Sequence, residues 1–337
     1  MRAWAIEDEW NIDHLRLTTR KEPRPGPGQV LLRMKASSLN FRDTYVIVRG
    51  YGSFTGNLPL VPISDGVGEV IETGPGVTRV KVGDRACPTF CQTWIGGEPT
   101  LERLSQSLGG PIDGTMVDLM CLSQEGVCKV PEHLSDEQAA GLPCAALTAW
   151  SAVVTNDRLG PCSRVLVLGT GGVALFALQF SKLLGAHVTM ISSSDAKLER
   201  VKQMGADACI NYSTTPEWYK PAREISGGSG FDHIVELGGE KTLPQTLRCI
   251  RPGGTVSMIG VLSGGALAAP LGLVVTRQVR LQGITVGSRD MFEAMLRAVA
   301  QHKVQPVIDK VFAFEQLKDG LAYLKGGSQF GKICIKH

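Results

Sequence analysis

A glycine-rich turn is the first feature of the sequence that points to a specific chemistry. The residues that fit the pattern G-x-G-x-x-G/A are Gly169, Thr170, Gly171, Gly172, Val173 and Ala174. In this pattern the first glycine permits a tight turn, the second lets a pyrophosphate approach the backbone, and the small last residue lets helix and strand pack closely. An apolar run at 165–168 precedes the turn and a segment with helical spacing follows it, which is the context that supports the pattern. The sequence therefore predicts that residues 169–173 bind a dinucleotide at a helix N-terminus.

The end of the next predicted strand bears on which dinucleotide binds. Sites selective for NAD usually place Asp or Glu there, about 20 residues after the turn. Here Ser192 and Ser193 follow the apolar run, and no carboxylate occurs before Asp195. Without an acid a 2′-phosphate is not repelled, and Lys197 can neutralise it. We therefore expect Ser192, Ser193 and Lys197 to favour NADP(H), with NAD(H) also possible. The alternative is that Lys197 is a solvated helix residue and that the site does not discriminate between NADP(H) and NAD(H).

Composition limits the class of protein and its environment. The chain has 337 residues, of which 43% are hydrophobic and 20% charged, which suggests a globular protein of two domains. The net charge of +3 gives little support to nucleic acid as the main partner. Nine scattered cysteines, an odd number, indicate free thiols in a reducing compartment, so a cytoplasmic location is expected. The N-terminus carries acids where a signal peptide would be apolar. An uncharged stretch at 252–276 contains prolines and glycines and predicts a strand and loop, not a membrane span.

Two regions of the chain differ in the elements that they predict. Residues 1–126 contain β-rich runs separated by turns, with no long helical period. From about residue 160, short apolar runs alternate with helical segments. The expected strands are 164–168, 187–191, 209–212, 233–236, 255–259 and 281–285, and the helices are 173–184, 195–204, 241–250 and 291–302. This alternation predicts an α/β fold with a parallel, doubly wound sheet. A last strand at 330–335 is expected to return to the first domain.

Several short segments along the chain match those of a known family. They are Asn40-Phe41-Arg42-Asp43-Thr44-Tyr45, 62–70, Leu147-Thr148-Ala149-Trp150, the glycine turn, Arg251-Pro252-Gly253-Gly254, Gly260-Val261 and Phe330-Gly331-Lys332. On these residues the sequence resembles the medium-chain dehydrogenase/reductase superfamily. It is most similar to the zinc-independent quinone oxidoreductase (zeta-crystallin-like) branch, and similar chains are also called zinc-type alcohol dehydrogenase-like proteins.

The resemblance implies a fold and a division into domains. A GroES-like, mainly β catalytic domain would consist of 1–126 and 287–337, and a Rossmann dinucleotide-binding domain of 127–286. The active site would lie in the cleft between them. The stretch at 92–117 departs from the family because it is longer than a minimal family loop, and we expect it to cap the cleft and change the substrate range. Members of the family are usually homodimers or homotetramers.

The resemblance also bears on zinc. The zinc-dependent relatives hold the metal with Cys, His-Glu and Cys, and these positions are Asn40, Ser64-Asp65 and Cys144 here. One thiolate and one carboxylate do not make a convincing three-ligand zinc site, so no metal is expected. The implied activity is NAD(P)H-dependent, zinc-independent hydride transfer to quinones or α,β-unsaturated carbonyls. The alternatives are a zinc-free alcohol or aldehyde dehydrogenase, and an NADPH-binding protein with little catalysis.

Individual residues are assigned roles by the same resemblance. Asn40 is expected to donate to a substrate oxygen, Asp43 to orient its neighbours, and Tyr45 to donate a proton to the acceptor or stack on it. The competing interpretation is that Asn40 is an ordinary loop asparagine that hydrogen-bonds to backbone groups, and that Tyr45 only packs against its neighbours. Further cofactor contacts are expected from Thr148 near the ribose, Tyr212 near the 2′-phosphate, Gly260 and Val261 over the nicotinamide, Thr285 and Val286 at the carboxamide, and Lys332 at a phosphate.

Overall fold

The computed structural model describes residues 1–157, 159–267 and 269–337, and it divides into two compact units. Unit 1 comprises Met1–Leu147 and Val286–His337, and unit 2 comprises Thr148–Thr285. The chain therefore leaves unit 1 after Leu147 and not after residue 126. The reason lies in packing, because the short helix α3 (Asp136–Ala140) packs against strands β3 (Gln29–Leu39) and β4 (Asp65–Thr73) of unit 1.

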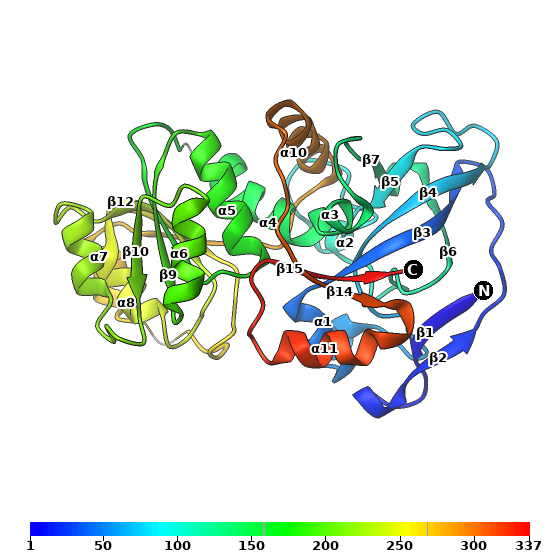
Figure 1. Cartoon of the computed structure of the whole chain (residues 1–337), viewed down its shortest axis with the longest axis horizontal. Helices are drawn as coiled ribbons and strands as arrows, with labels where there is room; N and C mark the ends of the chain where they lie inside the picture. The colour runs from blue at the N-terminus through cyan, green and yellow to red at the C-terminus, as the bar shows by residue number, and fades with distance from the viewer. Residues whose placement is uncertain (158, 268) are drawn as a thin grey trace. The chain divides into compact units, whose positions relative to one another are not determined.

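Unit 2 is an α/β domain with a six-stranded, fully parallel sheet (Figure 1). Its strands are β8 (Arg164–Leu168), β9 (His187–Ser192), β10 (Ala208–Asn211), β11 (Phe231–Glu236), β12 (Ile250–Met258) and β13 (Arg280–Gly283). Its helices are α5 (Gly172–Leu183), α6 (Asp195–Gln203), α7 (Tyr219–Ile225), α8 (Leu243–Cys249) and α9 (Leu271–Thr276), and the four-residue α4 (Leu147–Trp150) lies at its start. The fold class predicted from the strand–helix alternation is confirmed.

The order of the strands places the glycine turn at a special position. The sheet runs β10-β9-β8-β11-β12-β13, so the chain moves outward from β8 in one direction and then returns to β11 on the other side. Ligands of open parallel sheets bind at such a switch point, beyond the carboxyl ends of the strands. The central strands β8 and β9 are nearly continuous runs of buried residues, as expected for a sheet covered on both faces.

Unit 1 is built around a mostly antiparallel, GroES-like sheet of seven strands. The main path runs β14 (Ile308–Ala313), β15 (Lys332–Lys336), β3, β4, β5 (Arg85–Pro88) and β7 (Val127–Lys129), and β6 (Leu119–Ser123) pairs with β3. A hairpin of β1 (Arg2–Ile6) and β2 (Leu15–Thr19) is separate. The helices are α1 (Phe41–Ile47), α2 (Leu101–Leu104), α3, α10 (Arg289–His302) and α11 (Leu317–Lys325). The expected return of the C-terminal strand is confirmed, because β15 pairs with β3 (Figure 1).

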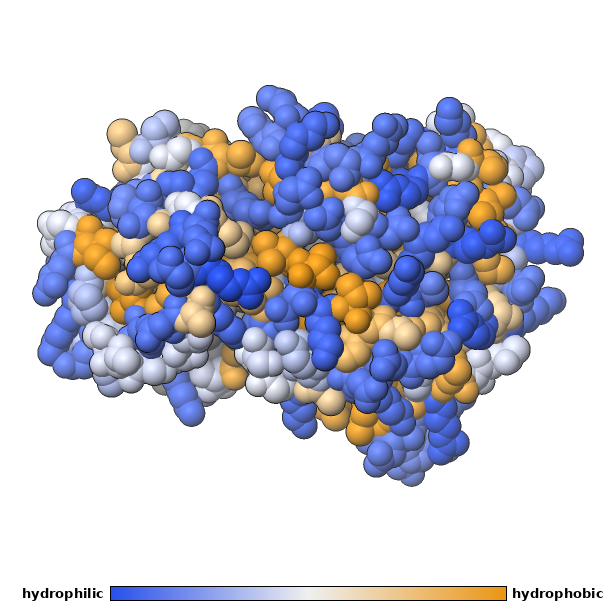
Figure 2. Space-filling model, in the orientation of Figure 1, coloured by the Kyte–Doolittle hydropathy of each residue, from blue (hydrophilic) through white to orange (hydrophobic). Residues whose placement is uncertain are grey.

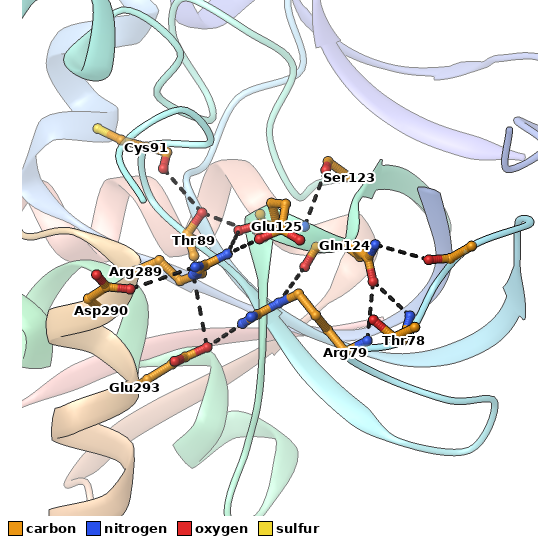
Figure 3. Close-up of polar contacts among 12 residues, drawn as sticks. Thr78, Arg79, Thr89, Cys91, Ser123, Gln124, Glu125, Arg289, Asp290 and Glu293 are labelled. Carbon is orange, nitrogen blue, oxygen red and sulfur yellow. Dashed lines mark hydrogen bonds and ion pairs between the residues drawn. The ribbon is translucent and has the colours of Figure 1, made fainter. Parts of the chain in front are cut away.

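An ion-pair network joins helix α10 to the segment before β5 and to the turn between β6 and β7 (Figure 3). Arg289 pairs with Glu125 and also approaches Glu293, which in turn binds Arg79. Arg289 is only 11% exposed, so these charges attract one another with less screening than surface pairs. The backbone N–H groups of Arg289 and Asp290 donate to Trp94 O and Ile95 O, at 2.9 and 3.0 Å. The stretch at 92–97 is thereby held at the N-terminus of α10.

No helix of the described residues is long and apolar enough to cross a membrane. On the face shown in Figure 2, hydrophobic residues form separate patches between hydrophilic ones. The uncharged stretch at 252–276 contains most of strand β12 and the short helix α9. The residue at position 268, within that stretch, lies outside the described residues.

Candidate functional site

Asn40 stands where strand β3 ends and helix α1 begins, in unit 1. Its backbone is extended, and its N–H donates to Asp43 Oδ2 at 2.7 Å. This bond is the half of a capping box in which the acid of the first turn reaches back to the residue before the helix. Asp43 is fully buried at the start of α1 and fixes the backbone of Asn40 through this bond, and its expected orienting role in the reaction stays a prediction.

The side chain of Asn40 contacts a buried lysine from the other end of the chain. Lys332, the first residue of β15, is 2% exposed. Its Nζ donates to Leu39 O at 2.7 Å and to Asn40 Oδ1 at 2.6 Å. The expected phosphate contact of Lys332 stays a prediction, but in this structure the ammonium is directed at Asn40.

Ser64 and Asp65 lie beside Asn40 and form a hydrogen-bonded chain. Asn40 Nδ2 approaches Ser64 Oγ at 3.4 Å, and Ser64 Oγ donates to Asp65 Oδ1 at 2.8 Å. The other oxygen of Asp65 accepts from the Cys144 N–H at 3.1 Å. Together with Lys332, residues from four separate segments of unit 1 thus meet at one polar cluster.

A strained residue places Ser64 and Asp65. Ile63 is fully buried and has φ 73°, which is rare for a β-branched residue. Its carbonyl accepts from the Thr115 N–H at 2.8 Å, and a Cβ on Gly114 would come within 2.1 Å of that oxygen. The surrounding loop therefore holds the conformation, and such strain is often found at functional sites.

Burial dominates the electrostatics of the cluster. It raises the pKa of the Asp43 carboxyl to about 6, against the lowering effects of the Arg42 charge and of the Asn40 N–H. It also raises the pKa of the Asp65 carboxyl, although the charge of Lys332 opposes the shift. The pKa of the Cys144 thiol is raised well above its usual range for the same reason.

The three positions that carry zinc ligands in zinc-dependent relatives do not offer a suitable donor set here. Asn40 Oδ1 is bonded to an ammonium, both oxygens of Asp65 are engaged within the protein, and burial favours the neutral thiol of Cys144 over the thiolate that binds metal. Within the ranges that the structure describes, no three His, Cys, Asp or Glu side chains are grouped to hold a metal ion. Zinc prefers three or four such ligands, so these residues do not fit it.

Three aromatic side chains of α1 and the turn that follows it lie close to one another. The ring of Tyr45 lies 5.5 Å from that of Phe41 and 5.9 Å from that of Tyr51, between centroids. These contacts place Tyr45 within an aromatic group at the surface of α1. Arg42 has a structural role, because its guanidinium donates to Leu108 O and Gly110 O.

The predicted dinucleotide turn in unit 2 has the conformation and the space that a pyrophosphate needs. Gly169 directly follows β8 and has φ 84°, a region that favours glycine. A Cβ added at Gly169 or at Gly171 would meet no atom within 4 Å, so the space beside the turn is open. Thr170, Gly172 and Val173 complete the turn into α5, whose first N–H groups lack partners within the helix. The residues present therefore fit a dinucleotide.

The residues expected at the 2′-phosphate gather at the carboxyl ends of β9 and β10. Ser192 ends β9 and pairs with Asn211, so that Tyr212 follows directly beside it. Ser193 is exposed, and Lys197 lies in the first turn of α6. Asp195, the first carboxylate after the strand, accepts a hydrogen bond from Asn211 Nδ2 at 2.7 Å.

The remaining predicted cofactor residues are placed as follows. Gly260 and Val261 follow β12, and a Cβ on Gly260 would lie 2.0 Å from Leu237 O, so that position requires glycine. Thr285 and Val286 follow β13, and Val286 has φ 53°. Thr148 is buried in α4. Contact of each of these residues with a cofactor stays a prediction.

Unit 2 also contains a buried chain of Ser257, His233 and Asp157 that sequence reasoning missed. His233 Nδ1 lies 2.6 Å from Asp157 Oδ2, and its Nε2 lies 3.1 Å from Ser257 Oγ. Serine hydrolases use the same three residue types. Here Ser257 and His233 are fully buried on neighbouring strands β12 and β11, so the chain ties the sheet together and is not open to a substrate.

The sequence singled out Asn40, Asp43 and Lys332 of the cluster in unit 1, with a phosphate contact expected for Lys332. It did not predict that Lys332 contacts Asn40. The contact between Lys332 and Asn40 spans 292 residues, and no local pattern in the sequence signals it. Ser64, Asp65 and Cys144 were noted only as positions where zinc ligands are replaced.

Comparisons with known proteins agree with this architecture. Residues 26–132 match the model of the alcohol dehydrogenase GroES-like domain, and residues 172–301 match that of the zinc-binding dehydrogenases. A zinc-type alcohol dehydrogenase-like protein of Schizosaccharomyces pombe is 40% identical over 99% of this chain and 98% of its own. A Sinorhizobium meliloti 1021 protein, provisionally an alcohol dehydrogenase, has a solved structure with TM-score 0.94 and 38% identity, covering 100% of this chain and 98% of its own. The structure of an NAD-dependent alcohol dehydrogenase has TM-score 0.91 and 32% identity over 100% of both chains.

Proposed function

Because this chain belongs to the zinc-type alcohol dehydrogenase-like family of medium-chain oxidoreductases, we propose that it is an NADP(H)-dependent reductase of activated carbonyl compounds that works without catalytic zinc. Its acceptors would be quinones or α,β-unsaturated carbonyls. The observation that carries the proposal is the bond between Lys332 and Asn40, at a position where zinc-dependent relatives hold the metal.

The choice of acceptor follows from what the cluster can supply. Zinc would polarise a carbonyl and stabilise an alkoxide. An amide donor gives weaker assistance, and a conjugated acceptor needs less of it because its π-system spreads the incoming charge. The bound NADPH supplies the hydride, and the protein supplies the donor and the positioning. Asn40 Nδ2 donates to the oxygen on which charge develops, as a donor of an oxyanion hole does. The rings of Tyr45 and Tyr51 offer a stacking surface for a planar acceptor.

A second function, alcohol or aldehyde dehydrogenase without zinc, has its own support. The relatives reported above are named alcohol dehydrogenases or alcohol dehydrogenase-like, and one of them is described as NAD-dependent. In that case the same Asn40 would hold the oxygen of an alcohol substrate.

The discriminating experiment measures oxidation of NADPH and of NADH with 1,4-benzoquinone and with an enone, with and without EDTA. Reduction of NADP⁺ by simple alcohols is measured in parallel. We expect EDTA-resistant turnover of the conjugated acceptors. Turnover of alcohols alone would establish the second function, loss of activity in EDTA would show a metal, and NADPH binding without turnover would indicate a binding protein.

The variant Asn40→Asp tests the donor itself. It keeps an oxygen for Lys332 but removes the Nδ2–H groups, so we expect kcat/KM to fall by about 10²-fold. Asn11→Asp is the matched control, because Asn11 caps a short surface helix with an oxygen that aspartate also has. Equal activity of both variants would reject the role of Asn40.

The cofactor preference is tested by Ser192→Asp. A carboxylate at the end of β9 repels a 2′-phosphate and can accept from a 2′-hydroxyl, so we expect the ratio of affinities for NADPH and NADH to fall by at least roughly tenfold. Ser229→Asp is the control, since Ser229 precedes β11 and therefore lies at the amino ends of the strands. An unchanged ratio in Ser192→Asp would show that the phosphate binds elsewhere.

A further inference from the structure

Lys332 is an unusual residue to find buried beside Asn40. Its side chain is 2% exposed, whereas Lys336 on the same strand is exposed. Burying an ammonium is costly unless hydrogen bonds and opposite charges compensate. Two oxygen acceptors and two buried carboxyl groups, those of Asp43 and Asp65, supply this compensation.

The contact determines how the amide of Asn40 is oriented. The two ends of an asparagine amide have nearly the same shape, so hydrogen bonds decide which end points where. An ammonium has three donors and no acceptor. Lys332 Nζ, at 2.6 Å, can therefore face only the oxygen of Asn40. The NH₂ group must then point away from Lys332.

The NH₂ group of Asn40 lies toward Ser64 and Asp65. It approaches Ser64 Oγ at 3.4 Å, a long hydrogen bond, and it also interacts with the carboxyl group of Asp65. The Ser64 hydroxyl uses its one hydrogen to donate to Asp65, so toward Asn40 its oxygen can only accept a hydrogen bond. Asn40 is partly exposed, so the oxygen of an acceptor can compete with Ser64 for an N–H of this group.

We propose that Lys332 is a positioning residue for the carbonyl reduction, which holds Asn40 with its NH₂ group toward the acceptor oxygen and polarises that group through the amide. The inference rests on the function proposed above. Hydrogen bonds in a chain strengthen one another, so the charge on the oxygen side makes the N–H a stronger donor. The lysine thereby supplies, through Asn40, part of the electrophilic assistance that a metal would give directly.

The test compares Lys332→Met and Lys332→Gln with the control Lys336→Met. The glutamine side chain keeps an N–H donor without the charge, and the methionine side chain keeps neither. We expect kcat/KM for the enone to fall about 10- to 100-fold in Lys332→Met and by less in Lys332→Gln. Lys336→Met should leave it unchanged. The affinity for NADPH, measured by fluorescence titration, should change by less than about threefold in all variants.

A double-mutant cycle separates positioning from a structural role. If Lys332 acts through Asn40, then adding Lys332→Met to Asn40→Ala should cause no further loss of kcat/KM. Thermal unfolding of each variant checks that the chain is folded, and Lys332→Gln replaces Lys332→Met in the cycle if the latter is not.

Each contrary outcome has its own meaning. An inactive wild-type chain would reject the proposed function and this inference with it. If the wild type is active, two results would reject the positioning role alone. One is an unchanged kcat/KM in the Lys332 variants, and the other is a fully additive loss of kcat/KM in the double-mutant cycle. Weaker NADPH binding with unchanged kcat would overturn it in favour of a phosphate contact for Lys332.

Discussion

Asp43 shows how burial at the candidate site changes the chemistry of one side chain. One carboxylate oxygen accepts from the Asn40 N–H, but the other has no partner within hydrogen-bond distance among the described residues. A buried and half-satisfied carboxylate is unfavourable, which is why the pKa of Asp43 rises to about 6. The folded chain consequently holds a proton there that the unfolded chain releases at lower pH.

The raised pKa of Asp43 predicts a pH-dependent stability. Between the ordinary value of 3.8 and about 6 the folded state binds more protons than the unfolded state, so this group contributes stability below about pH 4 that is lost as pH rises through about 6. In Asp43→Asn this loss disappears. Urea unfolding should show the variant gaining up to about 3 kcal/mol relative to wild type between about pH 4 and pH 7. Asp13→Asn on the surface is the control, and a pH-independent difference for Asp43→Asn would contradict the prediction.

Ile63 illustrates strain at the same scale. At φ 73° every residue except glycine is disfavoured, by about 1–2 kcal/mol. Both Ile63→Ala and Ile63→Gly lose the buried side chain and should be destabilised. The glycine variant should nevertheless be more stable than the alanine variant by about 0.5–1 kcal/mol, because only glycine relieves the strain. Chemical denaturation measures the difference in the free energy of unfolding between the two variants. If the alanine variant is the more stable one, the backbone at position 63 has moved out of the strained conformation.

At the scale of elements, the glycine turn between β8 and α5 is open toward solvent and not toward the protein core. Gly171 has no positive φ, and a Cβ there meets nothing within 4 Å. Folding therefore does not require glycine at this position, and close approach of a cofactor is the remaining reason for it.

Gly171→Ala should therefore separate binding from stability. We expect the free energy of unfolding to change by less than about 0.5 kcal/mol, whereas the Kd for NADPH rises by at least roughly tenfold. Gly160→Ala is the matched control, because a Cβ at Gly160 is equally unopposed but lies outside the turn. Unaltered NADPH affinity in Gly171→Ala would show that the pyrophosphate does not bind here.

At the scale of the whole molecule, the two units differ in how the chain builds them. Unit 2 is one continuous segment with its own six-stranded sheet and core. Unit 1 needs both ends of the chain, because β15 lies between β14 and β3 and contributes Ile333 and Ile335 to the core.

This difference predicts the behaviour of fragments. A fragment of residues 148–285 should fold and bind NADPH, and a fragment of residues 1–147 should not fold. The second fragment lacks two strands of its sheet and the core residues on α11. Circular dichroism with thermal unfolding tests both fragments. A cooperative transition in 1–147 would show that the first strands suffice for unit 1.

Local patterns in the sequence determined much of this protein. The alternation of apolar runs and helical segments predicted the parallel sheet, and the pattern at 169–174 predicted the turn between β8 and α5, because these features depend on residues close together in the chain. The family resemblance predicted the GroES-like domain. The motif from Asn40 to Tyr45 pointed to the segment of unit 1 where the buried polar cluster lies.

Only the tertiary structure decided which residues act together. The expected boundary at residue 126 followed a change of pattern, but α3 packs with unit 1, so the chain leaves that unit after Leu147. The strain at Ile63 is held by a loop that is distant in the chain, around Gly114 and Thr115. The contact between Lys332 and Asn40 depends on the pairing of β15 with β3. Such contacts depend on packing between segments that are far apart in the sequence, so local sequence patterns do not predict them.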